Sequence, residues 1–80
     1  MTPLVRVSGR ALAQLLPDLR YAPGPVYNAL ADGITALVLD GRIAPETRLP
    51  SERELAKHLA LSRATITAAY DALRGSGYLV

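Results

Sequence analysis

Residues 48–66, RLPSERELAKHLALSRATI, contain two helix starts with a short turn between them. The first start has the spacing of a capping box. In that motif the Ser51 hydroxyl accepts a hydrogen bond from the Glu54 backbone N–H, and the Glu54 carboxylate returns to the Ser51 backbone. We predict that this helix stops around residues 60–61. It should bury Leu55, Ala56 and Leu59.

The second helix start follows at once. Ser62 is a candidate N-cap, with Thr65 three residues later. We predict a helix over about residues 63–74, ended by the glycines that follow, and the beginning of a strand at residues 78–80. The predicted inward face of the helix consists of Ile66, Ala69, Tyr70 and Leu73.

Two short helices joined in this way form a helix-turn-helix, in which the first helix braces the second against a DNA major groove. The outward face near the second helix start is small and polar, and it carries Arg63. Small side chains let a helix enter a groove deeply, and arginine can bind guanine through two hydrogen bonds. Periodicity alone leaves an ordinary surface helix equally open. The outward residues are Arg63, Ala64, Thr65, Thr67, Ala68 and Asp71.

Upstream, an arm over residues 1–7 precedes a short helix with Ser8 as its N-cap. Pro17 disfavours helical backbone at Leu16, so the helix should end or kink there. Its apolar face could serve a dimer or domain contact, but we expect it to fold back onto the core. That face consists of Leu12, Leu15, Leu16 and Leu19.

After a proline- and glycine-containing linker over residues 21–25, a further helix is predicted to start at Pro25 behind Gly24 as its cap. Gly33 either permits a close helix contact or is simply tolerated, and Gly41 is typical of a left-handed C-terminal cap. The predicted buried stripe is Tyr27, Leu30, Ile34, Leu37 and Val38.

These elements predict a mainly α fold: a winged helix-turn-helix with a three-helix core and short β-strands, plus an extra N-terminal helix. Eighty residues suffice for one small domain. We divide the chain into an arm, helix and linker over residues 1–24 and a helix-turn-helix domain over residues 25–80.

Composition excludes several classes of function. The chain has no cysteine and a single histidine, so we expect neither a disulfide nor a metal site. There is no nucleophile–base pair or phosphate-binding glycine loop, so we expect no enzyme. No apolar run reaches the roughly 20 residues of a membrane span, and a signal peptide is not apparent. A cytoplasmic protein without membrane contact is expected.

Charge alone does not decide the partner. The net charge is +2, and the isoelectric point near 9.4 is compatible both with nucleic-acid binding and with an ordinary mixed-charge surface. The relevant stretch carries Arg42, Arg48, Arg53, Lys57 and Arg63, against Glu46, Glu52 and Glu54.

Three segments resemble the GntR family of bacterial regulators: RLPSERELA at 48–56, LSRATI at 61–66 and LRGSGYL at 73–79. The stretch from Val26 to Ile43 is similar to the first helix and turn of that family. Together these segments cover about two thirds of the chain, in matching order and spacing.

The resemblance implies a winged helix that binds double-stranded operator DNA, usually as a homodimer. It assigns DNA contacts to Arg53, Arg63 and Thr65, whereas Ala64 replaces the commoner threonine and lacks the contact expected there. The further DNA-binding candidates are Arg48, Glu52, Ser62 and Thr67.

Residues 65–73, TITAAYDAL, are similar to the MocR-like branch, whose DNA-binding domain is linked to a large domain resembling pyridoxal-phosphate aminotransferases. We expect no cofactor in this fragment, with pyridoxal phosphate confined to a missing C-terminal domain. Lys57 is a poor candidate for a Schiff base. The family's wing follows the strand beginning at Tyr78, so we expect a truncated wing.

The sequence therefore predicts the sequence-specific DNA-binding domain of a transcription regulator, with the helix at about 63–74 in the major groove. The alternative is a protein-interaction or dimerisation module without DNA contact. The arginines at the two helix starts, Arg53 and Arg63, distinguish these functions, because a docking module would not need them there.

Overall fold

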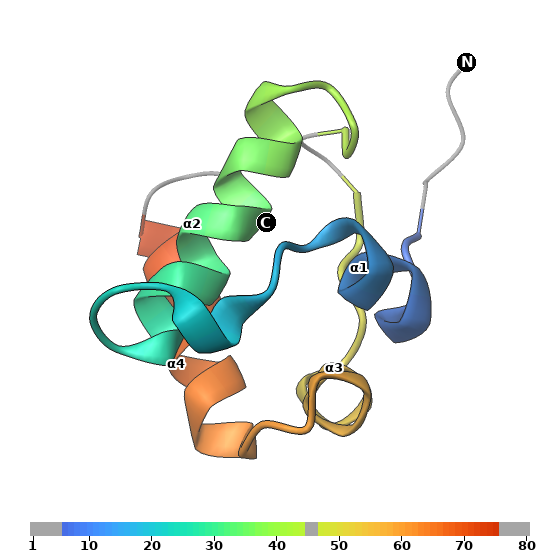
Figure 1. The fold of residues 1–80 in the computed structure, drawn as a ribbon. Coiled ribbons are helices and arrows are strands. Elements are labelled where there is room, and N and C mark those ends of the chain that lie inside the picture. Colours follow the sequence, from blue (N-terminus) through green and yellow to red (C-terminus); the bar gives the residue numbers. More distant parts are fainter. Residues whose placement is uncertain (1–5, 45–46, 76–80) are drawn as a thin grey trace.

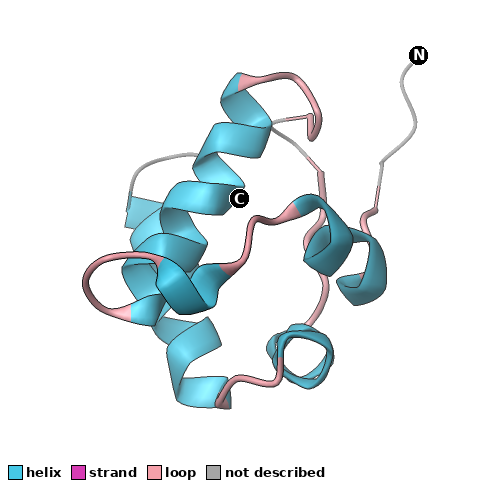
Figure 2. Cartoon of the chain, viewed as in Figure 1, coloured by secondary structure: helices cyan, strands magenta, loops and turns pink. Residues whose placement is uncertain are grey.

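The computed structural model describes residues 6–44 and 47–75, and in these residues it is helical (Figure 1 and Figure 2). No strand occurs in these ranges; an isolated parallel bridge joins Arg6 to Arg48. The predicted extended piece at residues 48–49 is thus a single bridge, and the strand predicted at 78–80 lies outside the described residues. The elements are α1 (Gly9–Leu15), the 3-10 helix η1 (Leu19–Tyr21), α2 (Val26–Leu39), α3 (Glu52–Leu59) and α4 (Arg63–Gly75).

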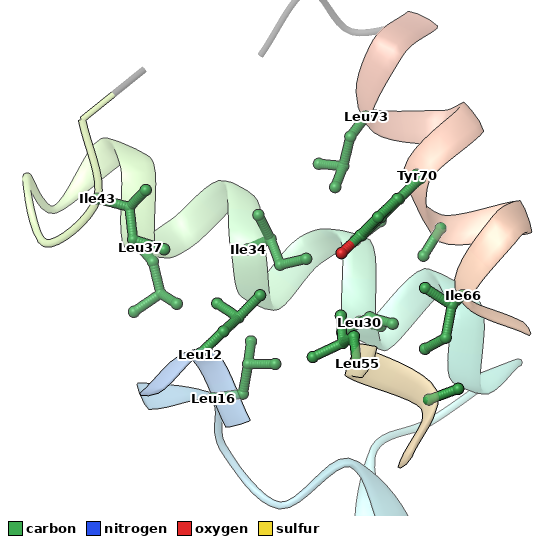
Figure 3. Packing of buried hydrophobic residues seen from close by; sticks show 13 residues of the cluster. Leu12, Leu16, Leu30, Ile34, Leu37, Ile43, Leu55, Ile66, Tyr70 and Leu73 are labelled. Carbon is green, nitrogen blue, oxygen red and sulfur yellow. The ribbon is translucent and has the colours of Figure 1, made fainter. Parts of the chain in front are cut away.

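All four α-helices contribute to one hydrophobic core, in which α2 packs against α4, α1 against α3, and α3 against α4. Figure 3 shows their buried side chains meeting in a single cluster. The N-terminal helix therefore folds back onto the core, as predicted. The largest fully buried side chains are Leu12, Leu30, Ile34, Leu55, Ile66 and Leu73.

The α1 helix begins and ends as its sequence predicts. The Ser8 hydroxyl accepts a 3.0 Å hydrogen bond from the Ala11 N–H, and Leu16, before Pro17, has extended backbone. The predicted apolar face is wrong at Leu15, which is 37% exposed while Leu12 and Leu16 are buried. A helix of two turns buries a narrow side, and Leu15 lies about 100° from Leu16 around the axis.

The start of α2 is displaced by one residue from the prediction. Pro25 is the N-cap, with extended backbone, and Gly24 lies before the cap with a φ of 78°. The buried stripe is wrong at Tyr27, which is 38% exposed because it lies in the first turn, at the edge of the packed interface. Leu30, Ile34 and Leu37 are buried as predicted.

The two glycines singled out in α2 and after it both have structural roles. A Cβ on Gly33 would lie 3.0 Å from Leu16 Cδ2, so this glycine permits the close contact between α2 and the end of α1. Gly41 has a φ of 78°, and its N–H donates to the Val38 carbonyl while the Arg42 N–H donates to the Leu37 carbonyl. These two bonds form a Schellman cap, which confirms the predicted helix end.

Candidate nucleic-acid interface

The start of α3 is capped by Ser51, the residue that precedes the helix. The Ser51 hydroxyl accepts a 3.1 Å hydrogen bond from the Glu54 N–H, which confirms half of the predicted capping box. The other half is wrong: the Glu54 carboxylate accepts from the backbone N–H of Gly9 in α1. Because α1 packs on α3 and Gly9 has no side chain, its backbone reaches Glu54. A Cβ on Gly9 would lie 2.8 Å from Glu54 Cγ.

The turn between α3 and α4 depends on one left-handed residue. Ala60 has φ 56° and ψ 41°, and the following Leu61 N–H donates to the Ala56 carbonyl. The Ser62 hydroxyl then caps α4 by accepting from the Thr65 N–H at 3.2 Å, as predicted, and the two side-chain hydroxyls lie 2.9 Å apart. Ser62, which caps α4, thus also holds Thr65 in the first turn of the helix.

The inward face of α4 is the predicted one: Ile66, Ala69, Tyr70 and Leu73 are buried. Sequence reasoning did not predict the partner of the Tyr70 hydroxyl, which donates a 2.7 Å hydrogen bond to the Pro50 carbonyl. Burial, followed by the charges of Glu52 and Glu54, raises the pKa of Tyr70. This bond fixes α4 to the residue immediately before the α3 cap.

A second polar contact joins the starts of the two helices. The Thr67 hydroxyl lies 2.8 Å from a Glu52 carboxylate oxygen and 2.9 Å from the Arg63 carbonyl, and its single proton serves one acceptor at a time. Thr67 is half-buried at the contact between α3 and α4, whereas the periodicity placed it on the outward face of α4. The structure brings the site candidates Glu52 and Thr67 into contact with each other.

The three basic candidates lie on the surface of the protein. Arg48, Arg53 and Arg63 are exposed, and none of the described carboxylates forms an ion pair with them. Ala64, also exposed, follows Arg63 in the first turn of α4.

Two other arginines are paired within their own segments. Arg74 contacts Asp71 at 3.0 Å, and Arg20 contacts Asp18 at 2.9 Å. The side-chain hydrogen bond from Arg20 is the main reason why the pKa of Asp18 is lowered to about 2. Arg53 and Arg63, near the starts of α3 and α4, have no ion-pair partner in the part of the chain that the structure describes, so their guanidinium groups provide donors suited to phosphate oxygens and guanine edges.

Comparison with known proteins identifies a family and several relatives that are similar to this chain. Residues 26–80 match the model of the family described as bacterial regulatory proteins, gntR family. The chain is 40% identical over 60 residues to the probable rhizopine catabolism regulatory protein MocR of Rhizobium meliloti. It is 42% identical over 57 residues to the HTH-type transcriptional regulator TauR of Rhodobacter capsulatus. It is 39% identical over 70 residues to the pyridoxine biosynthesis transcriptional regulator PdxR of Corynebacterium glutamicum.

These alignments cover 75%, 71% and 81% of the chain, but only 12%, 12% and 16% of MocR, TauR and PdxR, respectively. The similarity is therefore confined to a small part of each regulator. No solved structure matches the chain. None of the helices in residues 6–44 and 47–75 is long and apolar enough to cross a membrane.

Proposed function

Because the chain belongs to the GntR family of bacterial regulatory proteins and is a DNA-binding helix-turn-helix domain of that family, we propose that α4 enters the major groove of operator DNA. The observation that carries this proposal is a pair of exposed arginines at the starts of α3 and α4, Arg53 and Arg63, which form no ion pair with any described carboxylate. The proposed role is recognition rather than catalysis, and it implies a cytoplasmic location, where bacterial DNA lies.

The residues of the site divide by their contacts. Arg63 opens α4, where an arginine can bind guanine O6 and N7, and Thr65 beside it reads a base edge or a neighbouring phosphate. Arg53 and Arg48 set the position on the phosphate backbone. The exposed Ala64 adds no bulky side chain beside Arg63, which allows close approach to the groove.

The remaining candidates, Ser62, Glu52 and Thr67, make contacts within and between α3 and α4. Ser62 caps α4, and the Glu52 carboxylate holds the Thr67 hydroxyl. We propose that these contacts set the angle at which α4 meets the groove. Any contact that Ser62, Glu52 or Thr67 makes with DNA would use what remains of their hydrogen-bonding capacity.

We propose that two copies bind a two-part operator, with one copy of α4 in each half-site. The short share of MocR and TauR that the chain spans leaves room in such regulators for a further domain. We propose that a ligand held there changes the spacing of the two DNA-binding heads. Pyridoxal phosphate is the cofactor proposed for such a domain. The described residues do not fit it, because Lys57 is exposed on α3.

The direct test is a fluorescence titration of a random-sequence duplex at two salt concentrations. The variants are the Arg53→Ala/Arg63→Ala double mutant and an Arg20→Ala/Arg74→Ala control, which removes the same charge from arginines already paired with Asp18 and Asp71. Each lost phosphate contact should decrease the magnitude of the negative slope of log affinity against log salt by about 0.9. We expect the first pair to lose most of the binding and the control to retain it.

Two results would contradict the proposal. One is a folded wild-type chain that binds no duplex even at low salt. The other is equal loss of binding in both double mutants, which would indicate a response to net charge instead of a specific surface. Circular dichroism of each variant establishes that the helices are intact before the titrations are compared.

A further inference from the structure

The segment before α1 and the first residue of α1 each form a hydrogen bond with the stretch of chain that leads into α3 and begins it. The Val7 N–H donates to the Arg48 carbonyl at 3.2 Å, within the parallel bridge that pairs Arg6 with Arg48. Two residues later, the Gly9 N–H donates to the Glu54 carboxylate. These attachment points lie on either side of the Ser51 cap. The segment therefore lies alongside the start of α3, beside the basic candidate Arg48.

The bridge places two arginines directly opposite each other. Residues paired across neighbouring extended segments project their side chains from the same face, and like charges in such positions are destabilising. Arg6 and Arg48 are both exposed, and no described carboxylate forms an ion pair with either of them. By contrast, Arg20 and Arg74 each have an aspartate partner. Within residues 6–44 and 47–75, the Arg6–Arg48 pair therefore has no carboxylate partner.

We propose that Arg6 joins Arg48 in binding a backbone phosphate, so that the segment before α1 extends the DNA-binding surface beyond the helix-turn-helix. This inference rests on the proposed function of the domain. A phosphate offers several acceptor oxygens, so it can receive hydrogen bonds from two guanidinium groups and remove the repulsion between them. Arg6 lies outside residues 26–80, so the proposed contact goes beyond the part of the chain that the family model matches.

The test is the salt dependence of random-duplex binding for Arg6→Gln. Glutamine preserves the backbone bridge and a long polar side chain but removes the charge. The plot of log affinity against log salt has a negative slope, and its magnitude should decrease by about 0.9, as expected for the loss of one phosphate contact. Because phosphates carry no sequence information, affinity should fall by a similar factor on duplexes of different sequence. Arg6→Lys, which keeps the charge, should retain most of the slope.

The matched control is Arg20→Gln, which removes one charge from an exposed arginine that is already bound to Asp18. Its slope should change by less than half as much as that of Arg6→Gln. An unchanged slope in Arg6→Gln, or equal changes in both variants, overturns the role of Arg6. Failure of the proposed function is seen separately, as a wild-type chain that binds no duplex or as equal loss of binding in the Arg53→Ala/Arg63→Ala and Arg20→Ala/Arg74→Ala variants.

Discussion

The Tyr70 hydroxyl donates a 2.7 Å hydrogen bond to the Pro50 carbonyl oxygen, which joins the middle of α4 to the residue before the α3 cap. The bond is buried and spans 20 residues of sequence. Together with the contact between Thr67 and Glu52, it fixes α4 relative to α3. The position of Arg63 relative to Arg53 therefore depends on contacts made by neither arginine.

Removing the Tyr70 hydroxyl should destabilise the fold. Tyr70→Phe leaves the buried Pro50 carbonyl without its donor, which costs about 1–3 kcal/mol of unfolding free energy. Urea unfolding followed by circular dichroism measures the change. Tyr27→Phe is the control, since Tyr27 is 38% exposed, and it should alter stability by no more than about 0.5 kcal/mol. Equal stability of the two variants would contradict the role given to this bond.

Stability should also fall at alkaline pH through Tyr70. Its pKa in the folded chain is raised above the ordinary value of about 10, mainly by burial. The folded state therefore holds this proton more tightly than the unfolded state. The stability that this difference in pKa contributes is fully present below about pH 10 and is lost as the pH rises through the folded-state pKa. Urea unfolding at about pH 9 and about pH 11 should show a larger loss for wild type than for Tyr70→Phe.

The contact between Thr67 and Glu52 should affect DNA binding through the placement of α4. Thr67→Val keeps the shape of the side chain but removes the hydroxyl, at an expected cost of about 0.5–1.5 kcal/mol in stability. We also expect weaker duplex binding at a salt dependence close to that of wild type, because no charge is lost. Thr67→Ser, which retains the hydroxyl, should restore both properties. Weaker binding in both variants would instead point to the threonine methyl group.

The left-handed backbone at Ala60 offers a stabilising substitution. Glycine adopts a φ of 56° without the steric cost paid by alanine, so Ala60→Gly should raise the unfolding free energy by up to about 1 kcal/mol. The control is Ala36→Gly, at an exposed position inside α2, which should lower stability by about 1 kcal/mol. Thermal and urea unfolding give both values. A loss of stability at Ala60 would contradict the assigned turn conformation.

Two leucines of α1 should respond very differently to truncation. Leu12 is fully buried in the shared core, and Leu12→Ala should cost about 2–5 kcal/mol. Leu15 is 37% exposed, so Leu15→Ala should cost much less. Urea unfolding of the pair tests whether α1 is part of the folded domain. Similar small losses in both variants would show that α1 is not packed on the core in solution.

Local features of this fold were predictable from sequence because neighbouring residues determine them. The caps at Ser8, Ser51 and Ser62 need a hydroxyl within a few residues of a free N–H, and the end after Gly41 needs a residue that tolerates positive φ. The inward face of α4 follows from helical periodicity. The resemblance to the GntR family likewise rests on the order and spacing of short sequence segments.

Other features arose only when distant segments packed together. The partner of Glu54 is Gly9 instead of Ser51, because α1 lies across the start of α3. Leu15 and Tyr27 have the spacing of core residues, but the packed interfaces are narrower than the apolar stripes on their helices.

The bridge between Arg6 and Arg48 and the bond from Tyr70 to Pro50 likewise join segments that local patterns cannot relate. Sequence shows which backbone and side-chain groups need partners. The choice among distant partners depends on how the helices pack, since hydrogen bonds act only over about 3 Å.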